Sequence, residues 1–425
     1  MRTPVTRYLI AWLGASATAL LCVALFNLVV DPYGFYDLVR VQGFNAIKPQ
    51  ATSHSHIVKP YLIDRVRPHA MLLGDSRIEV GFDPESDAWP RDALPVLNLG
   101  LPGTGPAAHL QFVRYAVRGQ QLKYVLVGLH FNDFLSRKGS AAPQPETIRS
   151  GYRGLRVNDD GSPNSDYWLL KLADINSTLF SLDTLTHSAL TLAAQREKYP
   201  ADMTPLGFNP MRNYLGEAET AGYYYLFRTW HVAHVRPTAM LKAWESSSDF
   251  DQIREIIDVC RAHGVNLQLV IYPYHAQLLE LTRAAGLWEP FEQWKRELVR
   301  IVDEESRKQQ SGPAPHLWDF SGYNSVTTDA VPPRGNTSTA MRWYWEAGHF
   351  KKEVGNLVLE RIFRPEIAAR QVPSDFGVEL TPRNIEAHLA VIRSGQAAYR
   401  AANAASIAEI EDLLAPHLLN DGARP

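Results

Sequence analysis

Ser76 lies where an α/β protein would place a nucleophile. The apolar run at 71–73 ends in Gly74, Asp75 and Ser76, and charged residues follow. Glycine allows a sharp turn, and α/β proteins bind their ligands beyond the carboxyl ends of parallel strands. We therefore expect Ser76 to stand exposed at the edge of a sheet. The tripeptide alone is equally compatible with an ordinary turn, so its interpretation depends on partner residues elsewhere in the chain.

Glu346 and His349 are candidates for the acid and base that a serine nucleophile needs. They lie three residues apart in the sequence WEAGHF. In a loop, a carboxylate at this spacing can accept the Nδ1–H of the histidine and leave Nε2 free to face a serine. The sequence therefore predicts a Ser76–His349–Glu346 arrangement.

Three residues are candidate donors to the oxyanion that forms when a serine attacks a carbonyl. Gly103 lies in the glycine-rich turn NLGLPGTG, where a backbone N–H can point into the site. His130 and Asn132 lie in GLHFND, directly after an apolar run. Either side chain can donate a hydrogen bond from there, and the sequence leaves both alternatives open.

Further polar residues are candidate substrate contacts. Arg77 follows the serine and could hold an anionic group. His275 follows the apolar run at 265–272, so we expect it at the same edge of the sheet. Asp319 ends the run HLWDF and is a second candidate for the acid, or a substrate contact.

The elements that would position these residues alternate along the chain. Short apolar runs alternate with helical patterns, which is typical of βα units around a parallel sheet. The predicted class is α/β, with three layers in which helices flank the sheet. Strands are expected at 71–73, 95–100, 124–130, 265–272 and 316–320, and helices at 105–120, 248–263, 288–307 and 349–363. Ser248 and Asp251 resemble a capping box at the start of the second of these helices.

Two regions interrupt the alternation. Residues 135–245 exceed a normal crossover connection and are predicted to be a helical insertion within a domain spanning 60–364. The aromatic cluster at 223–231 is either the core of this insertion or a platform for sugar or lipid. Residues 365–425 are predicted to be a helical extension, with two amphipathic helices broken near Gly395.

The N-terminus carries a membrane signal. Residues 8–30 hold no charge and are long enough to cross a bilayer. Arg2 and Arg7 precede them, so residues 1–7 are predicted to be cytoplasmic and the rest extracytoplasmic. Residues 8–30 are expected to be an uncleaved signal anchor, with a cleaved signal peptide as the alternative, and residues 31–59 a juxtamembrane linker. His54 and His56, within that linker, lack partners for a metal site.

Composition excludes some classes of protein. A formal net charge of -2 gives no reason to expect a nucleic-acid partner. The hydrophobic content of 45% fits a globular protein with a substantial core. The two cysteines, Cys22 and Cys260, cannot form a disulfide framework because Cys22 lies in the apolar N-terminal segment.

Together these motifs resemble the SGNH (GDSL-type) hydrolases, over residues 70–133 and 265–363. Ser76 matches the nucleophile of that family, Gly103 the glycine of its second block, and Glu346-x-x-His349 its acid and base. Asn132 matches the oxyanion asparagine if the third block is aligned on Asn-Asp, whereas His130 takes its place if the block is aligned on the strand. The acid departs from the pattern, because glutamate replaces aspartate.

The resemblance is strongest to the membrane-anchored branch of the family found with polysaccharide O-acetylation machinery. It implies a flavodoxin-like fold and a serine esterase or O-acetyltransferase acting on a cell-envelope or secreted glycan, without metal or cofactor. It also implies a bacterial inner-membrane location with a periplasmic domain, and a membrane-bound acyltransferase as partner. The alternative is an inactive protein that keeps this fold to bind a glycan or to act as a scaffold for that acyltransferase.

Overall fold

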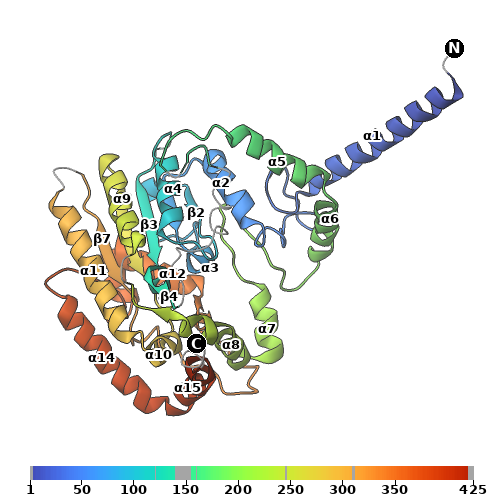
Figure 1. Cartoon of the computed structure of the whole chain (residues 1–425). Coiled ribbons are helices and arrows are strands. Elements are labelled where there is room, and N and C mark those ends of the chain that lie inside the picture. Colours follow the sequence, from blue (N-terminus) through green and yellow to red (C-terminus); the bar gives the residue numbers. More distant parts are fainter. Residues whose placement is uncertain are drawn as a thin grey trace.

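A six-stranded sheet forms the centre of the protein, with strand order β10-β7-β6-β3-β1-β2 (Figure 1). The computed structural model describes residues 3–119, 121–138, 155–158, 160–244, 247–308 and 312–419. Five strands run parallel and β10 is antiparallel to β7, which confirms the predicted α/β class with a mostly parallel sheet. The strands are β1 Ala70–Leu73, β2 Val96–Asn98, β3 Tyr124–Leu129, β6 Asn266–Ile271, β7 His316–Asp319 and β10 Val378–Glu379.

The central strands are apolar because both of their faces are covered. All four residues of β1 are buried, as expected for a parallel strand with helices on either side. β1 pairs with β2 from Ala70↔Val96 and with β3 from Ala70↔Tyr124. The segments that follow β1, β2 and β3 therefore leave the sheet at one edge, where the candidate residues were expected.

Helices cover both faces of the sheet. On one face α4 packs against α9, and α9 against α11; on the other, α3 packs against α12. The bounds are α3 Ser76–Gly81, α4 Pro106–Ala116, α9 Ser248–Ala262, α10 Ala276–Ala284, α11 Trp288–Arg307 and α12 Lys352–Phe363. Two details of the prediction are wrong. Ser247 caps α9 by accepting from Asp249 N–H, in place of the expected capping box, and α12 begins only at Lys352 because His349 belongs to a strand.

The region predicted as an insertion contains helices α5–α8 in its described part; residues 139–154, 159 and 245 lie outside the described residues. Strands β4 and β5 pair with each other at its two ends. Its aromatic cluster is divided, since Phe227 is buried in the core whereas Tyr225 is exposed. The bounds are β4 Ser136–Arg137, α5 Tyr167–Phe180, α6 Leu182–Ala194, α7 Asn213–Ala221, α8 Tyr223–Ala239 and β5 Leu241–Lys242.

The C-terminal extension is mostly helical, but it also supplies β10 to the central sheet, and the predicted break was misplaced. Helix α14 runs through Gly395, and the chain leaves the helix only at Asn403. α15 then packs on α8 and α10, where Ile410 and Leu414 are buried. The bounds are α13 Pro365–Gln371, α14 Ile385–Ala402 and α15 Ala404–Leu419, and residues 420–425 lie outside the described part.

The N-terminal helix α1, Pro4–Val30, projects from the body of the protein (Figure 1). Its mean hydropathy of 2.2 and its length suffice to cross a membrane, a property that signal sequences share. Residues 31–59 are folded against the domain, in contrast to the solvated linker that was predicted. Asp31, Asn45 and Lys48 are buried within this segment, and α2 (Ser55–Val66) begins inside it.

Helices α3 and α12 cross so closely that no side chain fits at Gly355. A Cβ on Gly355 would lie 1.8 Å from the backbone oxygen of Gly81. We expect Gly355→Ala to lower the free energy of unfolding by ~1–3 kcal/mol, because the helices must separate. Denaturant unfolding of the full chain in detergent, followed by circular dichroism, measures this loss. Gly119→Ala is the matched control, since its Cβ meets nothing within 4 Å; equal stability of both variants would contradict the packing argument.

Candidate active site

Ser76, His349 and Glu346 form a continuous hydrogen-bonded chain. The Ser76 hydroxyl donates to His349 Nε2 over 2.7 Å, and His349 Nδ1–H donates to Glu346 Oε1. The second carboxylate oxygen, Glu346 Oε2, accepts from the Gly348 N–H at 2.5 Å. These bonds fix the orientation of both the carboxylate and the imidazole, and the unprotonated Nε2 faces the serine hydroxyl.

The acid and base lie on a two-stranded hairpin rather than in the loop that was expected. β8 (Tyr344–Glu346) pairs with β9 (His349–Phe350), so Glu346 and His349 face each other across the turn. The hairpin is attached to the sheet because Tyr344 Oη donates to the carbonyl of Pro273, just beyond β6. Lys351, which follows β9, donates to Tyr223 Oη on α8 at 3.0 Å.

Ser76 is the first residue of α3, and buried polar groups hold this helix in place. Asn98 Nδ2 donates to the carbonyls of Ile78 and Phe82 at 2.7 and 2.8 Å. The buried ammonium group of Lys59 contacts Glu79 Oε1 at 3.0 Å. Each contact joins α3 to a neighbouring element, so the serine cannot move independently of the sheet edge.

Tyr272 supports the turn that precedes Ser76. Its hydroxyl accepts from the Asp75 N–H at 3.3 Å. It occupies the space above two glycines, since a Cβ on Gly74 would lie 2.4 Å from Tyr272 Oη and a Cβ on Gly128 would lie 2.2 Å from it. Glycine at both positions is therefore a packing requirement of this turn.

Asp75 and Arg77 form a buried ion pair beside the serine, with Arg77 Nη1 2.5 Å from Asp75 Oδ2. Asp75 also caps α3 by accepting from the Arg77 N–H. Burial alone would raise the pKa of Asp75, but Arg77 and His130 outweigh it and lower that pKa. Arg77 was expected to contact substrate; the structure buries its guanidinium against Asp75, and contact with substrate stays a prediction.

The candidate oxyanion donors follow β2 and β3, the two strands that flank the strand preceding Ser76. The N–H groups of Ser76 and Gly103 make no backbone hydrogen bond in the described part of the chain. The turn that carries Gly103 is joined to the turn before Ser76, because Leu101 N–H donates to the Gly74 carbonyl at 2.9 Å. Gly103 itself has a φ of 74°, a conformation that favours glycine.

His130 and Asn132 both lie at the end of β3. His130 Nδ1 is bonded to Tyr274 Oη at 3.1 Å, and burial followed by the Arg77 charge lowers the pKa of His130 to about 3. Its imidazole is therefore neutral at physiological pH. Asn132 lies in the 3₁₀ turn η2, Phe131–Phe134, half-buried, and its side-chain amide has no hydrogen-bond partner among the described residues.

Two other predicted site residues point elsewhere. His275 caps α10 through Nδ1 and bonds the Asp329 carbonyl through Nε2 at 2.9 Å, so both ring nitrogens are occupied. Asp319 is buried 2.6 Å from Lys295 Nζ and 2.9 Å from His388 Nε2. Both side chains are held by structural partners inside the protein, and their roles at the site stay predictions.

Trp230, from the aromatic cluster at 223–231, and His234, which sequence reasoning missed, bring the insertion to the β8–β9 hairpin. The Trp230 indole packs on the hairpin turn, where a Cβ on Gly348 would lie 2.4 Å from Nε1. His234 stacks on Trp230 with ring centroids 4.0 Å apart, and its Nδ1–H donates to the Trp230 carbonyl. The i, i+4 spacing from Trp230 was the available signal for His234, because it places both rings on one helix face.

The charged groups that act on the pKa of His234 are those of the Ser76 site, as expected for a residue next to the hairpin. Burial lowers its pKa, and the charges of Glu346, Arg77 and His349 all act on it. His234 Nε2 is left without a hydrogen bond among the described residues, on a side chain that remains exposed. The insertion thus contributes an aromatic surface and an exposed ring nitrogen next to the hairpin that carries Glu346 and His349.

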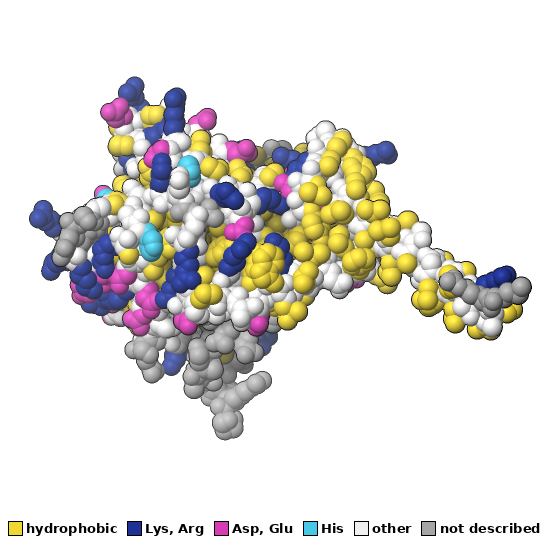
Figure 2. All heavy atoms as spheres, turned by 90° about the horizontal axis from the view of Figure 1, so that it is seen from above, with side chains coloured by type: hydrophobic (Ala, Val, Ile, Leu, Met, Phe, Trp, Pro, Cys, Tyr) yellow, Lys and Arg dark blue, Asp and Glu magenta, His cyan; other side chains and the backbone are white. Residues whose placement is uncertain are grey.

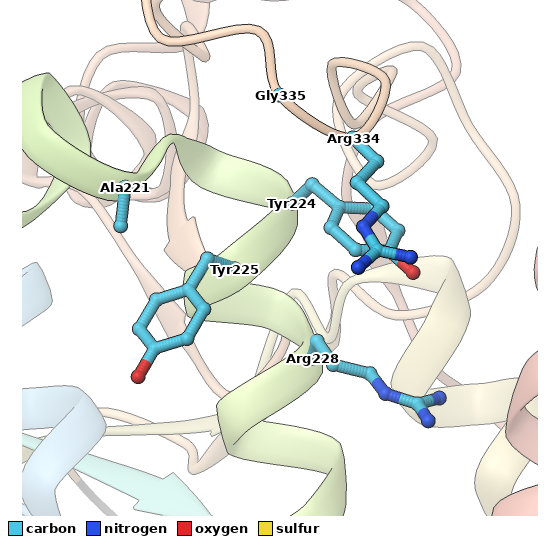
Figure 3. Close-up of a pocket in the computed structure, with 6 residues that line it drawn as sticks. All are labelled: Ala221, Tyr224, Tyr225, Arg228, Arg334 and Gly335. Carbon is cyan, nitrogen blue, oxygen red and sulfur yellow. The ribbon is translucent and has the colours of Figure 1, made fainter.

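A separate hollow of about 420 Å³ lies at the other end of α8 (Figure 3). The labelled residues come from the end of α7, the start of α8 and the loop at 334–335, and none of them belongs to the Ser76 site. The lining residues are Ala221, Tyr224, Tyr225, Arg228, Arg334 and Gly335. The hollow therefore does not serve as the substrate cleft of Ser76.

Comparison of the sequence with models of known protein families finds no match, and comparison with curated proteins finds none either. The assignment of a function therefore rests on the geometry of the site and on the resemblance of its motifs.

The Asp75–Arg77 pair gives a test of the site's architecture. Asp75→Asn keeps a capping side chain but leaves the Arg77 charge buried and unpaired, so we expect it to lower the free energy of unfolding by about 3–5 kcal/mol. Adding Arg77→Met should recover most of that loss. Denaturant titration of the full chain in detergent at pH 7 measures both variants.

The measurement is made at pH 7 because the fold lowers the pKa of Asp75. The pKa of Asp75 is lower in the folded chain than its ordinary 3.8, so the pair stabilises the fold above that pH and its contribution is lost as the pH falls further. Glu219→Gln is the control, because it removes an exposed ion pair with Lys198 and should leave the transition nearly unchanged. Equal losses in Asp75→Asn and Glu219→Gln would refute the buried-pair account.

Proposed function

We propose that this protein is a membrane-anchored serine acyl-ester hydrolase or O-acyltransferase of the SGNH type. The observation that carries the proposal is the continuous chain from the Ser76 hydroxyl through His349 to Glu346. Its position at the carboxyl ends of parallel strands supports the assignment. So does the order of the five parallel strands, which in chain order is 2-1-3-4-5 and is flavodoxin-like.

The geometry supports a two-step mechanism. Ser76 Oγ attacks the ester carbonyl while its proton passes to His349 Nε2, and Glu346 stabilises the imidazolium through Nδ1–H. The oxyanion accepts from the N–H groups of Ser76 and Gly103. His349 then returns its proton to the departing alkoxide, which leaves an acyl-enzyme and a free alcohol.

The second step releases the acyl group. His349 takes a proton from an incoming water or sugar hydroxyl, whose oxygen attacks the acyl carbonyl, and Ser76 leaves with the proton from Nε2. Water as acceptor gives hydrolysis, and a sugar hydroxyl gives transfer. His234, stacked on Trp230 next to the hairpin that carries Glu346 and His349, offers an exposed ring on which a sugar can stack, which supports a glycan as the substrate or acceptor.

The proposed setting is the outer face of a bacterial inner membrane, with α1 as an uncleaved anchor and a membrane-bound acyltransferase as partner. The polar contacts of α1 with the folded domain support retention of this helix. Asn27 Nδ2 donates to the Leu179 carbonyl, and Ser188 Oγ donates to Asn27 Oδ1. Cleavage after α1 would remove one partner from each of these bonds.

Reaction with a fluorophosphonate tests the nucleophile. We expect the full chain in detergent to be labelled once, at Ser76, and Ser76→Ala to abolish labelling. His349→Ala and Glu346→Gln should each slow it by roughly a thousandfold or more, because the hydroxyl loses its base or the base loses its orienting acid. Time-resolved labelling followed by peptide mass mapping measures these rates.

Ser86→Ala is the matched control and should label like the natural chain. Absence of labelling in the natural chain, combined with unchanged cellular function of Ser76→Ala, would favour the alternative of an inactive glycan-binding or scaffold protein. The hollow in Figure 3 is not lined by Ser76. A ligand site separate from the serine would fit a protein that binds a glycan without reacting with it, so the hollow supports this second candidate.

Hydrolysis of an activated acetyl ester distinguishes the two oxyanion candidates. We expect Asn132→Ala to lower kcat by about 10²–10³, the cost of one donor, because its amide is free to turn toward the oxyanion. His130→Ala should cost less, since Nδ1 is held by Tyr274. The reverse order of the two losses would assign the donor to His130.

A further inference from the structure

Several large, exposed apolar side chains gather next to the end of α1. Figure 2 shows hydrophobic side chains gathered over the part of the body from which α1 projects, continuous with the helix itself. We define the apolar collar by six of these residues: Leu38, Trp168, Leu169, Leu172, Phe180 and Leu182. Leu169 is 70% exposed and Leu182 76% exposed. Contiguous apolar surface of this kind marks an interaction site in soluble domains.

The collar is fixed in position relative to α1. Helix α1 packs against α5 and α6, which carry five of the six collar residues. The carbonyls of its last turn are also held by the segment that follows, since Asn45 Nδ2 donates to Val29 and Lys48 Nζ donates to Val30, both at 2.8 Å. The helix therefore meets the domain as a rigid joint, and the collar cannot turn away from the membrane that α1 enters.

The length of α1 places the collar at the membrane surface. The first residue of α1 to be buried by the domain is Ala24, followed by Asn27 and Val30. Residues 4–23 are left free, and 20 residues of helix span about 30 Å, the thickness of the hydrocarbon core, with the long side chain of Arg7 in the first turn reaching the head groups on the opposite side. The turns that α5 and α6 cover therefore begin where the lipid tails end, at the level of the head groups.

Aromatic and basic side chains at the collar fit this level. Lys171 Nζ lies 5.5 Å from the ring of Trp168, and the Arg156 guanidinium lies 5.6 Å from the same ring. Tryptophan is enriched at the boundary between lipid tails and water, and lysine there reaches toward phosphate groups. The collar thus combines an apolar face with cations at its margin.

We propose that the apolar collar is seated in the lipid interface on the side of the membrane where α1 ends, so that the domain lies on the bilayer in one fixed orientation. The partner is a lipid surface with anionic head groups, which the apolar residues enter to the depth of the upper acyl chains while Lys171 meets the phosphates; Arg156 is paired with Asp64. The inference rests on α1 spanning the membrane and is independent of catalysis at Ser76.

Depth-dependent fluorescence quenching tests the seating. The full chain, with Cys22 and Cys260 replaced by Ser, receives a single fluorophore at Leu169→Cys or Leu182→Cys. It is reconstituted in vesicles of phosphatidylcholine and phosphatidylglycerol that contain lipids carrying a nitroxide below the head group. Both collar labels should be strongly quenched by the lipid nitroxide and protected from aqueous iodide.

Val391→Cys is the matched control, because Val391 is equally apolar and 69% exposed, but on α14. It should show the opposite pattern. Collar labels that behave like the Val391 label would overturn the proposal. Collar labels that are protected from iodide yet not quenched by lipid would also overturn it, and would assign the surface to a second copy or to a protein partner.

Discussion

The hydrogen bond between Ser76 and His349 joins two parts of the chain that are 273 residues apart, and most of the fold serves to keep them together. On one side, α3 is held by Asn98 and by the close crossing with α12 at Gly355. On the other, the β8–β9 hairpin is held by the Tyr344 hydroxyl. Because each side is attached to the sheet through buried groups, the 2.7 Å separation is a property of the whole domain.

Buried charge is the second constraint at this edge of the sheet. The pairs Asp75–Arg77 and Lys59–Glu79 both lie out of contact with solvent and both end on or beside α3. Such pairs gain little stability over apolar residues of the same size, because desolvation offsets their attraction. Their geometry is nevertheless specific, since an ion pair must meet its partner at one distance and one angle. The site therefore depends on charges that have no direct role in the proposed chemistry.

The sequence predicted those features that depend on local pattern. The five parallel strands lie close to the expected positions, because a buried strand is a short apolar run. α11 spans the residues expected from its periodicity. Ser76, Glu346 and His349 were identified by residue type and spacing, and the structure brings the three together. The long apolar N-terminal helix was also evident, because no charge interrupts it.

Features that depend on long-range packing could not be predicted in the same way. Three polar residues at strand ends, where substrate contacts are common, are instead bonded to other groups inside the protein. Arg77 is buried against Asp75, whereas His275 and Asp319 bond to residues distant in sequence. Trp230 reaches the site only because the insertion folds back over the hairpin. The two-residue strand β10 carries no periodicity at all. Such outcomes are decided by tertiary contacts that no local pattern records.

Trapping of an acyl-enzyme tests the central claim most directly. The full chain is mixed with an activated acetyl ester, quenched in acid before deacylation is complete, and digested for peptide mass mapping. The account predicts one acetyl group, on the peptide that contains Ser76, and none in the His349→Ala variant treated for the same time. An acetyl group on a different residue, or equal acetylation in both proteins, would contradict it.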